Sequence, residues 1–296
     1  MKIIYLIIAH KNPKQVIKLV NKINTGNVCI LIHFGKDADD KSFELLVSEF
    51  EGEKNIFFIK RYESFWGRGI IEPILEGINV IAQKNLQFDF IVLLSGQDYP
   101  IKNRGEISNF FRNNRGKSFV SYVQLPEPTW DKGVNYRWER FFYTSFNPRK
   151  NFSSKIKFYF MNFVYNRLIL ILYGKRKFPT EFIPYGGSAW WCLSKDAIQY
   201  IYNFVKENEE FVEFFDYVFL PDEIFFQTIL LNSPLKENIV NQSLTYDNWI
   251  AGGSHPKILC TEDFDALMTI DALFARKFDA KECQEILDMI DRYHNE

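Results

Sequence analysis

The chain has 296 residues, 47% hydrophobic and 25% charged, which is enough apolar material for one large domain or two small ones. Its formal net charge of −1 gives no electrostatic reason to expect nucleic acid as a partner. The four cysteines are scattered without a C-x-x-C pair, which argues against a disulfide framework or a zinc site and favours a reducing compartment.

Alternating strand and helix patterns fill the first part of the chain. Predicted strands cover residues 3–10, 27–34, 55–60 and 88–100, and predicted helices cover residues 13–23, 43–50 and 69–85. Apolar strands that alternate with helices predict an α/β fold with a mostly parallel, twisted sheet and helices on both faces. The apolar start is too short for the core of a signal peptide, so we expect a cytoplasmic protein.

Polar residues follow three of these predicted strands. Ligands of parallel sheets bind beyond the carboxyl ends of the strands, which directs attention to these short stretches. They are Ala9 and His10, residues 33–36, and residues 95–98. None of them carries a GxGxxG or GxxxxGKS/T pattern, so a dinucleotide site or a P-loop is not indicated.

A basic and apolar segment occupies residues 149–177, with eight lysines and arginines and no acid. Its centre, FYFMNFVYNRLILILYG, is apolar on every face but is interrupted by Asn162, Asn166 and Arg167, which argues against a membrane span. We expect a buried helix with solvated basic flanks. The alternative is peripheral contact with an anionic membrane surface.

A glycine turn and an aromatic strand follow in the stretch YGGSAWW. Gly186 and Gly187 would let the backbone approach a ligand closely. Side chains alternate along a strand, so one of Trp190 and Trp191 is expected to face a cleft and the other the core.

An acidic pair, Asp222 and Glu223, precedes the strongly apolar run IFFQTILL. Ordinary helix starts have this form, because Asp222 can cap the first turn and Glu223 would lie where the helix dipole favours negative charge. From this stretch alone, a helix-start role for Glu223 is favoured over a role as general base.

Seven stretches occur together in a recognisable order: AHKNP, IHFGKD, SFWG, LLSGQDYPIK, YGGSAWWCLSKDAIQYI, PDEIFFQTIL and HPKIL…LFARKFD. In this the chain resembles bacterial members of the Core-2/I-branching N-acetylglucosaminyltransferase family, which includes the xylosyltransferases. The resemblance implies one GT-A-type domain over residues 1–296, with a nucleotide-binding half (1–125) and an acceptor and catalytic half (126–296). It also implies transfer from a UDP-sugar to an acceptor hydroxyl, with inversion and without a divalent metal.

The resemblance assigns roles to individual residues. Glu223 in PDE becomes the general base, with Asp222 as a structural neighbour. Lys257 in HPK and Lys277 in RKFD would stabilise the leaving diphosphate, a preorganised charge arrangement that replaces a metal. His10 and His33 match positions that line the uridine pocket. Relatives carry Asp two positions after this His, whereas this chain has Gly35, so either Asp37 takes over that contact or it is lost.

The remaining candidates surround the sugar. Asp98, Gly187, Ser188 and one of the two tryptophans would form the sugar-facing wall, and Trp66 is expected in the core or at the donor. Arg137, three residues before Arg140, would meet an acidic or phosphorylated acceptor or lie on the surface. Metal-dependent GT-A enzymes use a DxD motif where this chain has only Asp98, and the patterns at 37–39 and 263–265 are interpreted as chance.

Several functions stay open at this point. N-acetylglucosamine is the expected donor sugar, with xylose or glucuronate as alternatives, and the expected acceptor is a glycan or lipid-linked glycan. A glycoside hydrolase would need two carboxylates flanking the bond, which Glu223 and Asp98 could supply, but it would leave HPK and RKFD without a role. A non-catalytic carbohydrate-binding protein on the same scaffold is the third candidate.

Overall fold

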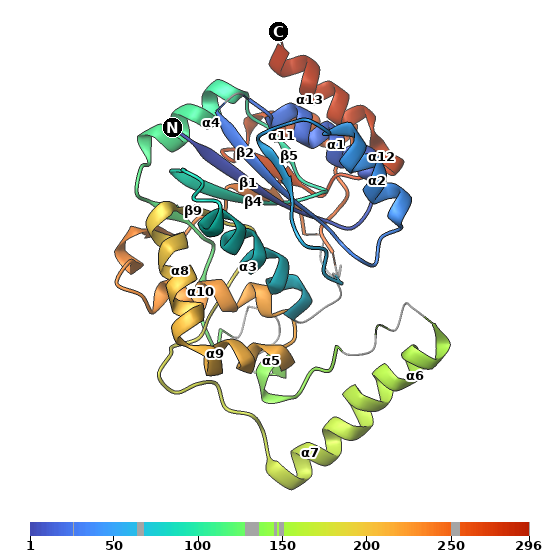
Figure 1. Cartoon of the computed structure of the whole chain (residues 1–296), viewed down its shortest axis with the longest axis vertical. Coiled ribbons are helices and arrows are strands. Elements are labelled where there is room, and N and C mark those ends of the chain that lie inside the picture. The colour runs from blue at the N-terminus through green and yellow to red at the C-terminus, as the bar shows by residue number, and fades with distance from the viewer. Residues whose placement is uncertain are drawn as a thin grey trace.

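The computed structural model describes residues 1–25, 27–63, 68–127, 136–144, 147, 151–249 and 255–295, and its centre is a twisted sheet (Figure 1). The strand order is β10-β6-β9-β4-β1-β2-β3. The strands are β1 (Ile3–Ala9), β2 (Val28–Phe34), β3 (Ile56–Phe58), β4 (Phe90–Ser95), β6 (Ser118–Phe119), β9 (Cys192–Ser194) and β10 (Ile239–Val240). Only β9 runs antiparallel to its neighbours within this sheet as described, so the predicted α/β class with a mostly parallel sheet is confirmed.

Helices cover both faces of this sheet. Successive strand residues point to opposite faces, and each face packs against its own set of helices. Tyr5 and Ile7 pack into one apolar cluster with α1 (Pro13–Ile23), α2 (Asp40–Glu49), α4 (Arg104–Asn113), α11 (Phe264–Thr269) and α13 (Glu285–Asn295). Ile4 and Leu6 pack into a second cluster with α3 (Arg68–Gln83), α8 (Lys195–Glu207), α9 (Glu209–Phe214) and α10 (Phe225–Leu231). The predicted helix at 13–23 is confirmed at both ends.

The late part of the chain returns to the end of β4. A small sheet has the order β11-β12-β5, formed by β11 (Thr245–Asp247), β12 (Phe274–Arg276) and β5 (Tyr99–Pro100). Ala275 pairs with Tyr99 in this sheet. The RKFD stretch is thereby brought beside SGQDYP, and the short helix α12 (Ala280–Cys283) follows it.

The two predicted halves share one sheet. Strands β9 and β10 come from the half predicted to bind the acceptor, yet they belong to the same seven-stranded sheet as β1. One apolar cluster likewise contains side chains from Ile3 to Ile290. A boundary near residue 125 therefore does not separate two cores. Beside this body, β7 (Val123–Gln124) and β8 (Tyr185–Gly186) form a two-stranded ribbon.

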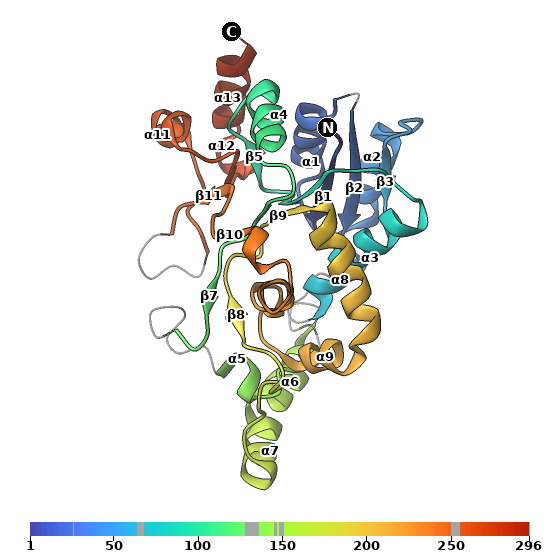
Figure 2. The ribbon, with the colours of Figure 1, turned by 90° about the vertical axis from the view of Figure 1, so that its left-hand side faces the viewer.

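A helical arm extends from the body, as both views show (Figures 1 and 2). It consists of α6 (Phe152–Tyr159), a π-helical stretch (Phe160–Tyr165) and α7 (Asn166–Tyr173), and it follows the short helix α5 (Tyr136–Glu139). The prediction of a buried helix is wrong here, because the Phe163 and Ile171 side chains are 64% and 74% exposed. Among the residues described, no helix combines the length and the apolar character needed to cross a membrane.

Candidate active site

A basic cavity of about 190 Å³ opens beyond the carboxyl ends of β1 and β4. This is where the rule for parallel sheets directs a search for ligands. Its lining residues come from five separate places in the sequence. The lining includes His10, Lys11, Ser95, Gln97, Trp190, Arg276 and Lys277. His10, Trp190 and Lys277, three of the residues proposed from the sequence, therefore meet at one cavity.

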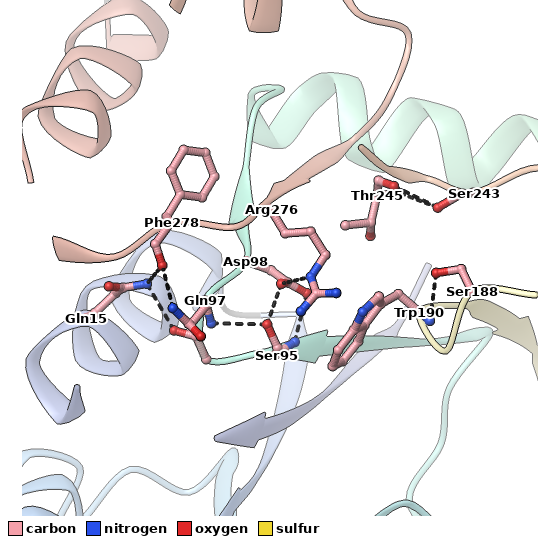
Figure 3. A network of polar contacts seen from close by, with 11 residues as sticks. Gln15, Ser95, Gln97, Asp98, Ser188, Trp190, Ser243, Thr245, Arg276 and Phe278 are labelled. Carbon is pink, nitrogen blue, oxygen red and sulfur yellow. Dashed lines mark hydrogen bonds and ion pairs between the residues drawn. The ribbon is translucent and has the colours of Figure 1, made fainter. Parts of the chain in front are cut away.

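Asp98 lies beneath this cavity rather than in its wall. Its carboxylate is fully buried and accepts hydrogen bonds from the Ser95 N–H at 2.8 Å, from the Ser95 hydroxyl and from Arg276 Nε at 3.1 Å (Figure 3). Burial raises the pKa of Asp98, and the Arg276 charge and the Ser95 donors oppose that rise. The prediction that Asp98 faces the sugar is corrected, because this carboxylate acts on the cavity through Arg276.

Arg276 joins Asp98 to Trp190. Its guanidinium carbon lies 4.4 Å from the centre of the Trp190 ring, a cation–π contact that leaves the indole in the cavity wall (Figure 3). Trp191 points the other way, is 1% exposed and packs edge-on against Phe226. The predicted alternation is confirmed, and Trp191 is removed from the candidate sugar-binding residues.

Lys277 is half-buried at the cavity, and no ion pair to it is found among the described residues. Burial, together with the nearby positive charges of Arg276 and Lys11, lowers the pKa of Lys277. Lys11 is bridged to Asp279 at 2.8 Å. The charged form of Lys277 is therefore disfavoured at the cavity, and an anion bound beside it would lower its free energy.

Buried polar contacts fix this basic site. Gln15 donates to the Gly96 and Phe278 carbonyls at 3.1 and 3.0 Å, and Gln97 donates to the Phe278 carbonyl at 3.1 Å (Figure 3). Asp279 accepts a hydrogen bond from Asn12 at 2.9 Å. As the N-cap of α12, it also accepts one from the Lys281 N–H. The first helix and the RKFD stretch are thereby held together on either side of Lys277.

Lys257 is placed elsewhere. Its ammonium contacts Asp263 at 2.8 Å and Glu262 at 3.3 Å, and these hydrogen bonds raise its pKa. It does not line the cavity. The predicted diphosphate contact of Lys257 is therefore not supported, and the lysine instead neutralises two acids at the 3-10 turn Thr261–Asp263.

The two histidines have different environments. His10 is exposed and lines the cavity. His33 is fully buried, and its Nε2 accepts a hydrogen bond from the Tyr62 N–H at 3.0 Å, so it supports the backbone instead of lining the cavity. Gly35 donates its N–H to the Ala9 carbonyl at 2.8 Å. The role proposed for Asp37 stays a prediction, and Trp66 lies outside the described residues.

Burial lowers the pKa of His33 to about 4, which predicts an acid-sensitive stability. The unfolded chain takes up a proton at this histidine near pH 6.5, whereas the folded chain does so only near pH 4. The contribution of neutral His33 to the free energy of unfolding is therefore full above pH 6.5. It falls by about 3 kcal/mol as the pH is lowered toward 4. His33→Gln, which keeps an acceptor for Tyr62, should remove that loss when urea unfolding is compared between pH 7 and pH 4.5. Parallel pH profiles for the two proteins would contradict the assignment.

Glu223 ends a 3-10 turn, Pro221–Glu223, two residues before α10 begins. Its Oε2 accepts a hydrogen bond from Arg137 Nη1 at 2.7 Å. The Arg137 side chain is 5% exposed and that of Glu223 is 29% exposed. Arg137 is therefore not a surface residue, which was one of the two alternatives given from the sequence. Its charge is directed to Glu223. It orients a partly accessible carboxylate.

Asp222 does not cap the helix. The residue before α10 is Ile224, with no side-chain cap, and Asp222 Oδ1 is buried without a hydrogen-bond partner in the described structure. Burial and the neighbouring Glu223 raise the pKa of Asp222 to about 7. Leu220, just before the turn, has a left-handed backbone with φ of 48°. Such strain in a residue other than glycine is often found at functional sites.

The glycine turn packs against the turn that carries Glu223. A Cβ atom on Gly187 would lie 1.9 Å from the Ser121 carbonyl oxygen, so only glycine fits this approach of two backbones. Gly187 N–H donates to the Glu223 carbonyl at 2.9 Å, and Gln227 donates to the Ser188 carbonyl at 2.7 Å. The PDE turn is therefore tied to the loop that carries Trp190.

Sequence reasoning missed Arg276 and Lys11 in the basic cavity. Both lie inside motifs of the family resemblance, RKFD and AHKNP, next to Lys277 and His10. A larger cavity, of about 780 Å³, lies between α1 and α13, where Lys18 and Lys22 are already neutralised by Asp291. No cluster of three metal-binding side chains occurs within the part of the chain described.

Comparisons with known proteins agree with the motifs. Xylosyltransferase 2 of Canis lupus familiaris is 23% identical over 314 residues, covering 98% of this chain and 33% of that protein. Xylosyltransferase oxt of Drosophila pseudoobscura pseudoobscura is 24% identical, covering 95% and 32%. The chain thus spans about a third of the length of these relatives. A crystal structure of S. aureus TarS (residues 1–349) covers 43% of this chain and 37% of that one at 14% identity, with a TM-score of only 0.30.

A family model also matches most of this chain. It covers residues 3–267, which include the PDE turn, the YGGSAWW stretch and the ends of β1 and β4. This chain belongs to the Core-2/I-Branching enzyme family.

Proposed function

We propose that this chain is an inverting glycosyltransferase, which moves a sugar from a UDP-sugar to a hydroxyl of a glycan acceptor without a divalent metal. The observation that carries the proposal is the basic cavity of Lys11, Arg276 and Lys277 beside Trp190. The oriented carboxylate of Glu223, on a turn tied to the Trp190 loop, gives further support.

Each group has a chemical task in this proposal. The acceptor hydroxyl attacks the anomeric carbon while the bond from that carbon to the UDP oxygen breaks, and Glu223 takes the hydroxyl proton. Negative charge develops on the departing diphosphate, where Lys277, Arg276 and Lys11 stabilise it. Arg137 keeps the Glu223 carboxylate in place during the transfer. Trp190 presents an indole ring on which a sugar face can stack.

For the donor sugar we propose N-acetylglucosamine, with xylose as the second candidate. Xylose is kept as the second candidate because the relatives named above are xylosyltransferases. The test is to measure UDP release from a panel of UDP-sugars, with and without added glycan acceptors. UDP binding without any transfer would favour the non-catalytic reading, and hydrolysis of glycosides without UDP affinity would favour a hydrolase.

Metal independence leads to a direct prediction. Asp98, the acid at the place of a DxD motif, is already occupied by Arg276, and three cations surround the cavity. Activity in excess EDTA should therefore equal that of the untreated enzyme. A loss of turnover that Mn²⁺ restores would overturn this part of the proposal.

We further propose a glycan or lipid-linked glycan as the acceptor, and a cytoplasmic location at the membrane face. The exposed arm of residues 152–173 supports a location at the membrane. Fractionation of cells that produce the intact protein, with and without a high-salt wash, tests this location.

A further inference from the structure

The helical arm exposes an unusual amount of apolar surface. Large hydrophobic side chains at least 38% exposed occur along its whole length. They are Phe152, Ile156, Tyr159, Phe160, Phe163, Val164, Tyr165, Leu168, Ile171, Leu172 and Tyr173. Elsewhere in the described chain such residues are few and scattered, and they include Leu45 and Val47 on α2. Contiguous patches of this kind mark interaction surfaces.

Two asparagines of the arm, Asn162 and Asn166, face the body. Asn162 exchanges two hydrogen bonds of 2.8 Å with the Tyr143 backbone, and Asn166 accepts from and donates to the Phe141 backbone at 3.3 and 2.6 Å. Phe158, one helical turn before Asn162, is buried on the same side. The asparagines that interrupt the apolar sequence are therefore anchors, and they fix which face of the helix points outward.

The outward face is apolar and carries positive charge. Ile156, Phe160, Phe163 and Ile171 follow one another at helical spacing, and Arg167 lies among them. Exposed lysines flank this face at Lys155, Lys157 and Lys177. At the base of the arm, Arg176 is inserted between the rings of Phe141 and Phe214, at 4.7 and 4.3 Å, which holds the arm to the body.

We propose that this arm is a membrane-docking helix, which lies in the interface of an anionic lipid bilayer. Its aromatic and aliphatic side chains enter the boundary between headgroups and acyl chains, while its lysines and arginines contact lipid phosphates. The helix of 22 residues from Phe152 to Tyr173 lies along the membrane and does not cross it. The docking helix would explain the membrane location proposed above, and the docking proposal does not depend on sugar transfer.

Charge favours a lipid surface over a second copy of the chain. Residues 149–177 contain eight basic residues and no acid, whereas the chain as a whole has a net charge of −1. Two arms packed against each other would bring like charges together, which opposes association. Lys175 is paired with Glu139 and Arg176 packs against the body, but Lys155, Lys157 and Arg167 are exposed, and an anionic lipid surface supplies the opposite charge to them.

The test is sedimentation of the intact protein with lipid vesicles. Binding is expected to vesicles that contain phosphatidylglycerol and to be at least tenfold weaker to pure phosphatidylcholine, and high salt should weaken it further. The triple variant Phe160→Ser, Phe163→Ser, Ile171→Ser should lose binding by at least tenfold. Leu45→Ser with Val47→Ser, which removes exposed apolar groups from α2, should bind as the parent does.

Two further measurements separate the possible failures. The triple variant should keep the parent's UDP affinity and circular dichroism, because its substituted side chains are more than half exposed. Lys155→Glu with Arg167→Glu should also weaken binding to phosphatidylglycerol vesicles, whereas Lys41→Glu should not. Equal binding of the parent and the triple variant, or a stable dimer that dissociates in the triple variant while vesicles are ignored, would overturn the proposal. A failure of vesicle binding with normal sugar transfer would leave the proposed enzyme function standing.

Discussion

Glu223→Gln is expected to lower the rate of sugar transfer by roughly 10²–10⁴-fold, because glutamine cannot take the proton of the acceptor hydroxyl. UDP affinity should stay close to the parent's, since the basic cavity does not include Glu223. The measurement is single-turnover transfer at saturating donor, alongside UDP binding by calorimetry. Transfer at a near-parental rate would remove Glu223 from the role of general base.

Two controls separate chemistry from folding. Glu223→Gln weakens a charge-assisted contact with the buried Arg137, so a loss of about 1–3 kcal/mol in unfolding free energy is expected, and rates should be compared well below the melting transition. Asp222→Asn keeps the shape of the neighbouring side chain, whose carboxyl already titrates near neutral pH. That variant should retain far more activity than Glu223→Gln. The reverse ranking would make Asp222 the base.

Lys277→Ala is expected to weaken UDP binding and to slow transfer by about 10²–10³-fold, equivalent to ~2.7–4 kcal/mol. Its ammonium is half-buried at the cavity beside Arg276 and Lys11, where a diphosphate would be held away from much of the solvent. Calorimetry with UDP and transfer kinetics at a fixed salt concentration measure the two effects.

Lys257→Ala is the matched control. It removes an equal charge from a neighbouring motif, but this lysine is occupied by Asp263 and Glu262. UDP affinity should therefore change less than threefold, a difference below about 0.7 kcal/mol. Equal losses in both variants would restore Lys257 to the diphosphate site, and no loss in either would place the phosphate elsewhere.

Most of the sheet could be predicted from the sequence, because its strands are buried on both faces and are therefore almost continuously apolar. The helix at 13–23 was found at both ends, since apolar residues recur on one face and Pro13 marks its start. The arm could not be predicted this way. Burial of an apolar helix depends on whether another element covers it, which its own sequence does not show. The pattern also does not show that Asn162 and Asn166 bond the inward face to the backbone of residues 141 and 143.

The candidate site was predictable in its motifs but not in its contacts. His10, Trp190, Lys277 and Glu223 were all selected because their stretches resemble those of a known family. Which side chain faces the cavity depends on its ion-pair partner, and the motifs alone do not show whether that partner is distant, as Asp98 is from Arg276, or nearby, as Asp263 is from Lys257. Asp263 holds Lys257 outside the cavity, whereas Arg276 lines the cavity while it is bonded to Asp98.

The ion pair between Asp98 and Arg276 joins residues 178 positions apart. During synthesis from the amino terminus, strands β1 to β4 are complete long before Arg276 and Lys277 have been made. The early strands therefore emerge without the basic side chains that line the cavity, and the pairing of β5 with β12 has to wait for residues made near the end of synthesis. A nucleotide that binds only the closed cavity can stabilise the finished molecule, but it gives no help to the unfinished one on the ribosome.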